Sequence, residues 1–100
     1  MNLLEAVKQE CRYTLNVLKA RVSSDSDGIH YGAMTPSITA RMNTRMNGSN
    51  IARLTIRQCR ERLKKLERNG VLISRPTPGG LTRWWPVGFA DEANTAENES

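Results

Sequence analysis

Apolar residues recur at helical spacing over the first 22 residues of the chain. One stripe consists of Leu4, Val7, Cys11, Leu15, Leu18 and Val22, and it predicts a helix over 2–22. A second apolar arc makes this face wider than one core covers on a peripheral helix; it consists of Leu3, Ala6, Tyr13, Val17 and Ala20. We expect the second arc to contact another copy of the chain. The alternative is that the C-terminal tail or a hairpin of the same chain folds over it.

The pattern changes after this helix. The turn formers "SSDSDG" at 23–28 end it, and 29–34 predicts a short strand, although Gly32 weakens that pattern. A short helix then starts with Thr35 as its cap and Pro36 in its first position, where the missing N–H costs nothing.

This second helix places Ile38 and Met42 on one face and is expected to end near Asn43. Residues 44–53 contain Asn-Gly and no sustained period, so they predict a loop with up to one extra helical turn.

The clearest helical signal begins at Thr55, which forms a capping-box pattern with Gln58. The expected buried stripe is Ile56, Cys59, Leu63 and Leu66, and the opposite face carries Arg57, Glu61, Lys64, Lys65 and Arg68. Asn69-Gly70 supplies a left-handed stop.

Two β-rich runs, "VLISR" and "LTRWWPV", flank "PTPGG" and predict a β-hairpin. Period-two alternation sends Trp85 and Val87 to one face and Thr82 and Trp84 to the other. We expect Trp85 to pack the base of the hairpin against the helices. Trp84 either covers the second arc of the first helix or stacks on a sugar or an unpaired base. Pro86 indicates that the strand lies at an edge or ends there.

Charge is unevenly distributed along the chain. The formal net charge is +5, but residues 41–83 carry eleven basic side chains against two acidic ones, whereas the final residues carry only acids. A segment this basic favours a polyanion as partner, because neutralising phosphates releases counterions. The tail after Gly88 is expected to be disordered.

The segment "LTIRQCRERLKKLERNGVLISR", followed by a turn and "RWWPV", resembles the recognition helix, exit and wing of the winged helix-turn-helix family. The resemblance implies an α+β, mostly helical fold: a winged helix with three helices and a C-terminal β-hairpin wing. It divides the chain into an N-terminal amphipathic helix and turn at 1–28, the winged helix-turn-helix at 29–88 and a disordered acidic tail at 89–100. The eleven residues between Asn43 and Thr55 depart from the tight turn usual in the family.

The resemblance implies binding to double-stranded DNA, with the third helix in the major groove and the hairpin near the backbone. The candidates for base contacts are Arg57, Gln58 and Glu61, whose side chains suit guanine, adenine and cytosine respectively. The candidates for phosphate contacts are Arg41, Arg45, Arg53, Lys64, Lys65, Arg68, Arg75 and Arg83. The alternative for this helix face is a solvated surface with i,i+4 pairs among Arg57, Glu61 and Lys65.

The expected function is a sequence-specific DNA-binding transcriptional regulator that acts by operator occupancy as a homodimer. The alternative is a winged-helix module that docks on a regulatory protein or on transcription or replication machinery; structured RNA is a third, weaker option. No enzymatic activity, cofactor or metal is expected, because no catalytic or metal-ligand cluster is visible. Cys11 and Cys59 are expected to be reduced core residues. The interrupted apolar pattern of the N-terminus predicts a cytoplasmic protein without a membrane span.

Overall fold

The computed structural model describes residues 2–18, 28–45, 54–79 and 81–90. The elements are α1 (Leu3–Leu18), α2 (Gly28–Tyr31), β1 (Ala33–Met34), α3 (Thr35–Arg45), α4 (Ile56–Arg68), β2 (Leu72–Pro76) and β3 (Thr82–Pro86). The described chain is therefore α+β and mostly helical, with one small antiparallel sheet.

The sheet has the order β1-β3-β2, so the last strand of the hairpin lies in the centre. β2 and β3 form the predicted hairpin, with Ser74 opposite Trp84, and Ala33 pairs with Trp84 from the other side. β3 ends at Pro86 as expected, since proline has no N–H to continue the ladder.

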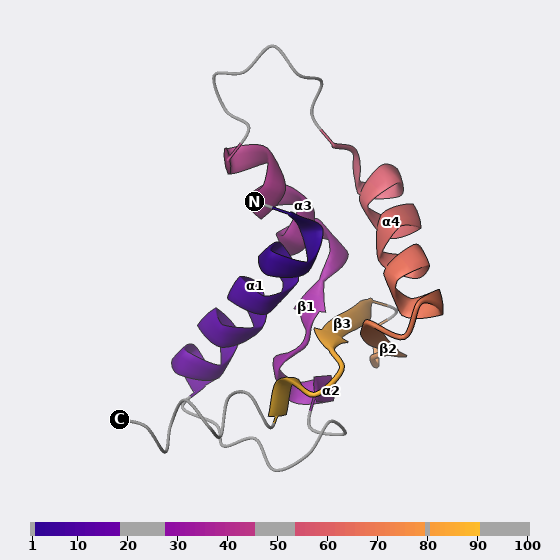
Figure 1. Cartoon of the computed structure of the whole chain (residues 1–100). Coiled ribbons are helices and arrows are strands. Elements are labelled where there is room, and N and C mark those ends of the chain that lie inside the picture. Colours follow the sequence, from indigo (N-terminus) through magenta and orange to yellow (C-terminus); the bar gives the residue numbers. More distant parts are fainter. Residues whose placement is uncertain (1, 19–27, 46–53, 80, 91–100) are drawn as a thin grey trace.

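Helices α1 and α4 lie on opposite sides of the molecule, with the sheet and α3 between them (Figure 1). α1 packs against α3 and β3, whereas α4 packs against α3 and β2. Both contacts bury the predicted stripes, including Val7 and Cys11 of α1 and Ile38 of α3, each 0% exposed. α3 and the sheet thus join the two outer helices into one core.

The described part of the first helix agrees with the prediction. The side chain of Asn2 accepts a hydrogen bond from the N–H of Glu5 and caps the helix start. α1 is described as far as Leu18, and the rest of the predicted span, 19–22, lies outside the described residues. Leu18 is 54% exposed, which contradicts its place in the buried stripe. Ala20 and Val22 lie outside the described residues.

The strand expected at 29–34 is wrong for its first half, because Gly28–Tyr31 forms a helical turn closed by a hydrogen bond from Gly32 N–H to Gly28 O. We attribute this difference to a tertiary contact with Trp85. The indole of Trp85 lies on the bare backbone of this turn, where a Cβ at Gly28 would come within 2.1 Å of the ring. The two glycines that weaken a strand therefore make room for a buried aromatic side chain.

Helix α3 extends over Thr35–Arg45, beyond the predicted end at Asn43. Ile38 and Met42 share its buried face as expected. The hydroxyl of Thr35, predicted to cap the helix, instead accepts a hydrogen bond from Nε1 of Trp84 at 3.0 Å. The start of α3 is therefore tied to the sheet by a side chain distant in sequence.

Both tryptophans are buried, on opposite faces of β3 as the alternation predicts. Trp85 packs with Tyr31 in an edge-on arrangement at 6.5 Å between ring centroids, which confirms its structural role. Trp84 is 3% exposed, so it is not presented for stacking on an unpaired base. It also leaves two residues of the second arc of α1 uncovered, Tyr13 and Val17, which are 60% and 61% exposed.

The acidic tail does not begin at residue 89, as the predicted boundary had it. Phe89 is 0% and Ala90 2% exposed, and Phe89 packs against Tyr31 with 5.2 Å between ring centroids. Val87, predicted to align with Trp85, lies beyond the end of β3 and is 52% exposed. The prediction of disorder concerns 91–100, which lie outside the described residues.

Candidate nucleic-acid interface

Helix α4 begins and ends as its sequence predicts. The side chain of Thr55 accepts from the N–H of Gln58 at 3.1 Å, and the side chain of Gln58 accepts from the N–H of Thr55 at 3.0 Å, which completes the capping box. At the other end Gly70 has φ +79°, a left-handed conformation that glycine adopts without strain. Local signals therefore define the length of the helix.

Tertiary contacts then set which side of α4 faces outward. Cys59 and Leu63 are 0% exposed, and Leu66 packs against the core as a half-buried residue. The side chain of Asn43 exchanges two hydrogen bonds with the backbone of Leu54, each 2.9 Å long, and so attaches the approach to α4 to the end of α3. Ile56, expected in the buried stripe, is 47% exposed, so its place in that stripe is wrong.

The outward side of α4 is strongly cationic. Every basic residue of the helix is exposed, namely Arg57, Arg60, Arg62, Lys64, Lys65 and Arg68. Glu10 and Arg41 form an ion pair on the other side of the molecule, whereas the charged residues of α4 form none with a described residue. The i,i+4 pairing of Arg57, Glu61 and Lys65 is therefore absent from this structure, and the cations stay in solvent.

The three candidates for base contacts lie exposed in the first two turns of α4. The side chains of Arg57 and Glu61 form no hydrogen bond or ion pair with a described residue. Gln58 differs, because its Oε1 already accepts from Thr55 N–H in the capping box. Pairing with adenine uses both the oxygen and the nitrogen of the amide, so Gln58 can make it only if the capping box opens.

The predicted phosphate contacts separate into three groups. Lys64, Lys65 and Arg68 on α4 and Arg75 on β2 are exposed. Arg41 and Arg83 are held by other parts of the protein, as described next. Arg53 and the side chain of Arg45 lie outside what the structure describes.

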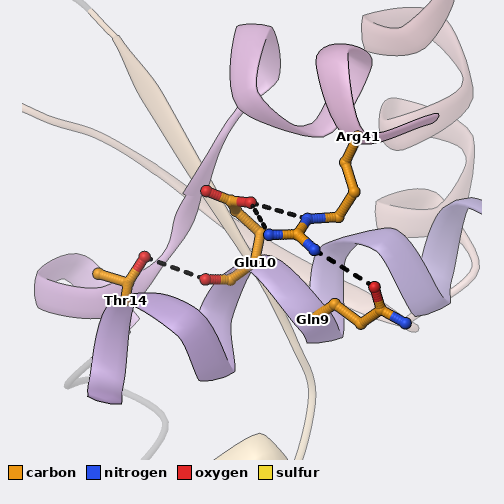
Figure 2. A network of polar contacts seen from close by, with 4 residues as sticks. All are labelled: Gln9, Glu10, Thr14 and Arg41. Carbon is orange, nitrogen blue, oxygen red and sulfur yellow. Dashed lines mark hydrogen bonds and ion pairs between the residues drawn. The ribbon is translucent and has the colours of Figure 1, made fainter. Parts of the chain in front are cut away.

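Arg41 joins α3 to α1 rather than facing solvent. Its guanidinium contacts Oε2 of Glu10 through Nη2 at 2.8 Å and through Nε at 2.9 Å, and Nη1 donates to Gln9 at 3.3 Å (Figure 2). The backbone carbonyl of Glu10 also accepts from Thr14, one turn further along α1. Since this guanidinium already has protein acceptors on both sides, a phosphate at Arg41 would have to compete with Glu10 and Gln9.

Arg83 is held in a similar way. Its Nη1 donates to the backbone carbonyl of Gly32 at 2.9 Å, and the side chain is half-buried beside β1. Arg75 lies opposite Arg83 in the hairpin register but is exposed. The wing therefore offers one exposed cation among the described residues, on β2.

Sequence reasoning missed Arg60 and Arg62 as site residues, although both are exposed on α4. A stricter helical count could have found Arg60, because it lies one turn from Arg57 on one side and from Lys64 on the other. Arg62 flanks the buried stripe, and its positive charge acts to lower the pKa of the Cys59 thiol.

Both cysteines are buried thiols, as predicted. Burial raises the pKa of Cys11 to about 12, and the nearby charge of Glu10 adds to this, while a backbone hydrogen bond from Ala33 acts in the opposite direction. Burial also raises the pKa of Cys59 against the opposing effects of Thr39 and Arg62. Neither thiol is ionised at neutral pH, and the described residues bring no three His, Cys, Asp or Glu side chains together.

The residues predicted for dimer contact do not form one surface. Ala6 is 0% exposed and belongs to the core of its own chain, so its assignment is wrong, and Leu3 is half-buried against that core. Tyr13, Val17 and Leu18 are exposed at 60%, 61% and 54%. An apolar surface thus remains at the C-terminal half of α1, narrower than predicted. None of the described helices has the length and apolar character needed to cross a bilayer.

No protein-family model, curated protein or solved structure matches the chain.

Proposed function

We propose that this protein is a cytoplasmic winged helix-turn-helix regulator that binds double-stranded DNA sequence-specifically and acts by operator occupancy. The observation that carries the proposal is the outward side of α4, where six basic side chains are exposed without an ion pair among the described residues. Such a surface attracts a polyanion and gains affinity from counterion release.

The element order supports the same function. A strand before α3 pairs with the last strand of the hairpin, and α4 lies between α3 and that hairpin in sequence. This order is the one implied by the winged helix-turn-helix resemblance, with α4 as recognition helix and β2–β3 as wing. Arg57 and Glu61 read base edges, while Lys65, Arg68 and Arg75 contact phosphates.

The test is a fluorescence-anisotropy titration of a labelled mixed-sequence duplex at several salt concentrations. The variant Lys65→Ala/Arg68→Ala removes two cations from α4, and Lys8→Ala/Arg12→Ala removes two from α1, so the net charge changes equally. We expect the α4 variant to lower the slope of log affinity against log salt by about 2 and the α1 variant to lower it far less. Equal slopes in the two variants, or no binding at low salt, contradict the proposal.

Sequence specificity needs a separate measurement, because salt dependence reports phosphates alone. Selection of tight-binding duplexes from a random pool should yield a preferred site for the unaltered protein. Arg57→Ala should relax the preference at one base position and cost about 1–3 kcal/mol there. A pool that shows no enrichment would leave only non-specific binding.

A homodimer is part of the proposal and rests on the exposed apolar residues Tyr13, Val17 and Leu18. A two-fold operator with half-sites about one helical turn apart follows from it. Light scattering of the protein and of Tyr13→Glu/Val17→Glu tests this part, with a lower mass expected for the variant. If the unaltered protein is a monomer at high micromolar concentration, the same surface favours the second candidate function, docking on a regulatory protein.

A further inference from the structure

A cleft of about 340 Å³ lies between α4, the start of α3 and the hairpin. Its size falls within the range of small-molecule sites, about 300–1,000 Å³. α4 contributes one side of the helix to it, where Ile56, Arg60, Lys64 and Glu67 recur at intervals of three or four residues. This side lies between the buried stripe and the outward residues proposed to contact DNA.

Part of the cleft is apolar. Pro36, Ile56, Leu81 and Trp84 line it from four different elements or turns. Ile56 and Leu81 are 47% and 49% exposed, so about half of the surface of each residue is not buried by the rest of the chain. A ligand with an apolar body would remove this surface from water.

The Trp84 ring is held in place within this lining. Its only polar atom, Nε1, already donates to Thr35. Trp84 is 3% exposed, so it forms the buried floor of the cleft, and the apolar surface open to a ligand is mainly that of Ile56 and Leu81.

The other part of the cleft is charged. Arg60 and Lys64 lie one turn apart, and neither forms an ion pair with a described residue. Glu67 also lines the cleft, but its carboxylate accepts from the hydroxyl of Ser74. Two cations against one carboxylate leave an excess of one positive charge, which matches one carboxylate on a ligand.

This combination distinguishes a small acid from a DNA backbone. A sugar-phosphate chain would satisfy Arg60 and Lys64 but would gain little from Ile56, Leu81 and Trp84. We propose that the cleft binds a small amphipathic acid, an apolar body bearing one carboxylate. The apolar body lies mainly against Ile56 and Leu81, and the carboxylate accepts hydrogen bonds from Arg60 and Lys64.

Binding of this acid regulates DNA binding, a consequence that rests on the proposed function. Lys64 is among the candidates for phosphate contact, and Arg60 lies one turn before it. A carboxylate that neutralises them removes positive charge from the surface that the duplex approaches. The acid should therefore weaken DNA binding by about three- to tenfold at fixed salt.

The site itself is tested without DNA, by calorimetric titration of the full chain with 2-naphthoate. The controls are acetate, which has the charge without the apolar body, and 2-naphthamide, which has the body without the charge. We expect saturable binding of 2-naphthoate at one site and at least about tenfold weaker binding of each control.

Two charge-matched variants locate the site. Arg60→Gln/Lys64→Gln should weaken 2-naphthoate binding by about tenfold or more. Arg62→Gln/Lys65→Gln removes the same charge from residues outside the cleft and should change it less than about twofold. Ile56→Gln, at an exposed position, should weaken binding while leaving folding intact. Absence of saturable binding, or equal weakening by the two double variants, overturns the site.

The regulatory consequence is tested by repeating the DNA titration with 2-naphthoate, using acetate at the same ionic strength as the control. Weakened DNA binding with 2-naphthoate alone supports the regulation. Unchanged DNA affinity with the cleft occupied overturns it. If 2-naphthoate binds but no duplex does, the proposed function fails while the site stands; if duplex binds and 2-naphthoate does not, only the site fails.

Discussion

The interface between α1 and α3 and the outward side of α4 use the same type of side chain in opposite ways. Arg41 lies in the first region and forms hydrogen bonds to Glu10 and Gln9, with 30% of its side chain exposed. Lys65 and Arg68 lie in the second and have no ion-pair partner among the described residues. Sequence reasoning assigned all three to phosphates. The difference teaches that a cation is available to a polyanion only when no carboxylate of its own chain reaches it.

The largest expected effect comes from removing a large side chain of the core that lies between the two regions, the buried Trp85. Trp85→Ala deletes a ring that is 2% exposed and contacts Gly28 and Tyr31. We expect a loss of about 3–5 kcal/mol in the free energy of unfolding, measured with urea. Trp85→Phe, which retains a ring, should lose less. A loss below about 1 kcal/mol for the alanine variant would contradict the packing described for β3.

Alkaline pH should weaken the core between the regions through the two buried thiols. Burial raises the pKa of Cys11 in the folded protein from its ordinary value of 9.0 to about 12. The folded state therefore holds this proton more tightly, and the stabilisation is complete below pH 9 and decreases as pH rises toward 12.

Above the pKa of the unfolded thiol, we expect the free energy of unfolding to fall by about 1.4 kcal/mol per pH unit for Cys11. Cys59 adds to the fall, because its pKa is raised too. Urea unfolding between pH 8 and 10 measures the slope, and Cys11→Ala should make it shallower. An equal slope in that variant would show that Cys11 does not contribute.

Arg41→Gln tests the contrast between the regions directly. It leaves the carboxylate of Glu10, 17% exposed, without its cation, and should cost about 1–2 kcal/mol of unfolding free energy. The salt slope for DNA should stay unchanged. Lys65→Gln should have the opposite pattern of effects. We expect its free energy of unfolding to stay within about 0.5 kcal/mol of the unaltered protein and its salt slope for DNA to be lower by about 1. If Arg41→Gln changes the salt slope as Lys65→Gln does, the two regions are not distinct.

The smallest effect concerns how α4 is held as a helix. Thr55→Ala removes one half of the capping box and should cost about 1 kcal/mol, with faster amide exchange in the first turn. Glu61→Gln should change stability by less than about 0.5 kcal/mol, since Glu61 forms no ion pair here. A larger loss for Glu61→Gln than for Thr55→Ala would favour the i,i+4 pairing over the cap.

Predictions from local signals agree best with the structure. The capping box at Thr55, the glycine stop at Gly70 and the hairpin strands around the turn all lie where the residues indicate. Each of these features is formed by residues only a few positions apart, so the interactions that stabilise it can be inferred from a short segment of sequence. The exposed cations of α4 follow from the same periodicity.

Predictions failed where a distant residue decided the outcome. Gly28–Tyr31 became a helical turn because Trp85 packs on it, more than fifty positions later in the chain. Thr35 was predicted to cap a helix, but its hydroxyl accepts from Nε1 of Trp84, another residue distant in sequence. Phe89 looked like the start of a polar tail, but it is buried beside Tyr31. A single aromatic residue carries no periodicity, so no pattern in the sequence indicates its partner.

The sequence by itself determined that α1, α3, α4 and the β2–β3 hairpin form, and it determined their amphipathic stripes, the basic second half and the boundaries of α4, because propensity, capping and periodicity act over a few residues. Only the tertiary structure decided which cations remain in solvent and which, like Arg41 and Arg83, bind the protein itself. It also decided that Ile56, Leu81 and Trp84 line one cleft with Arg60 and Lys64. Both outcomes depend on distances between side chains on different elements, and these distances exist only after the core has formed.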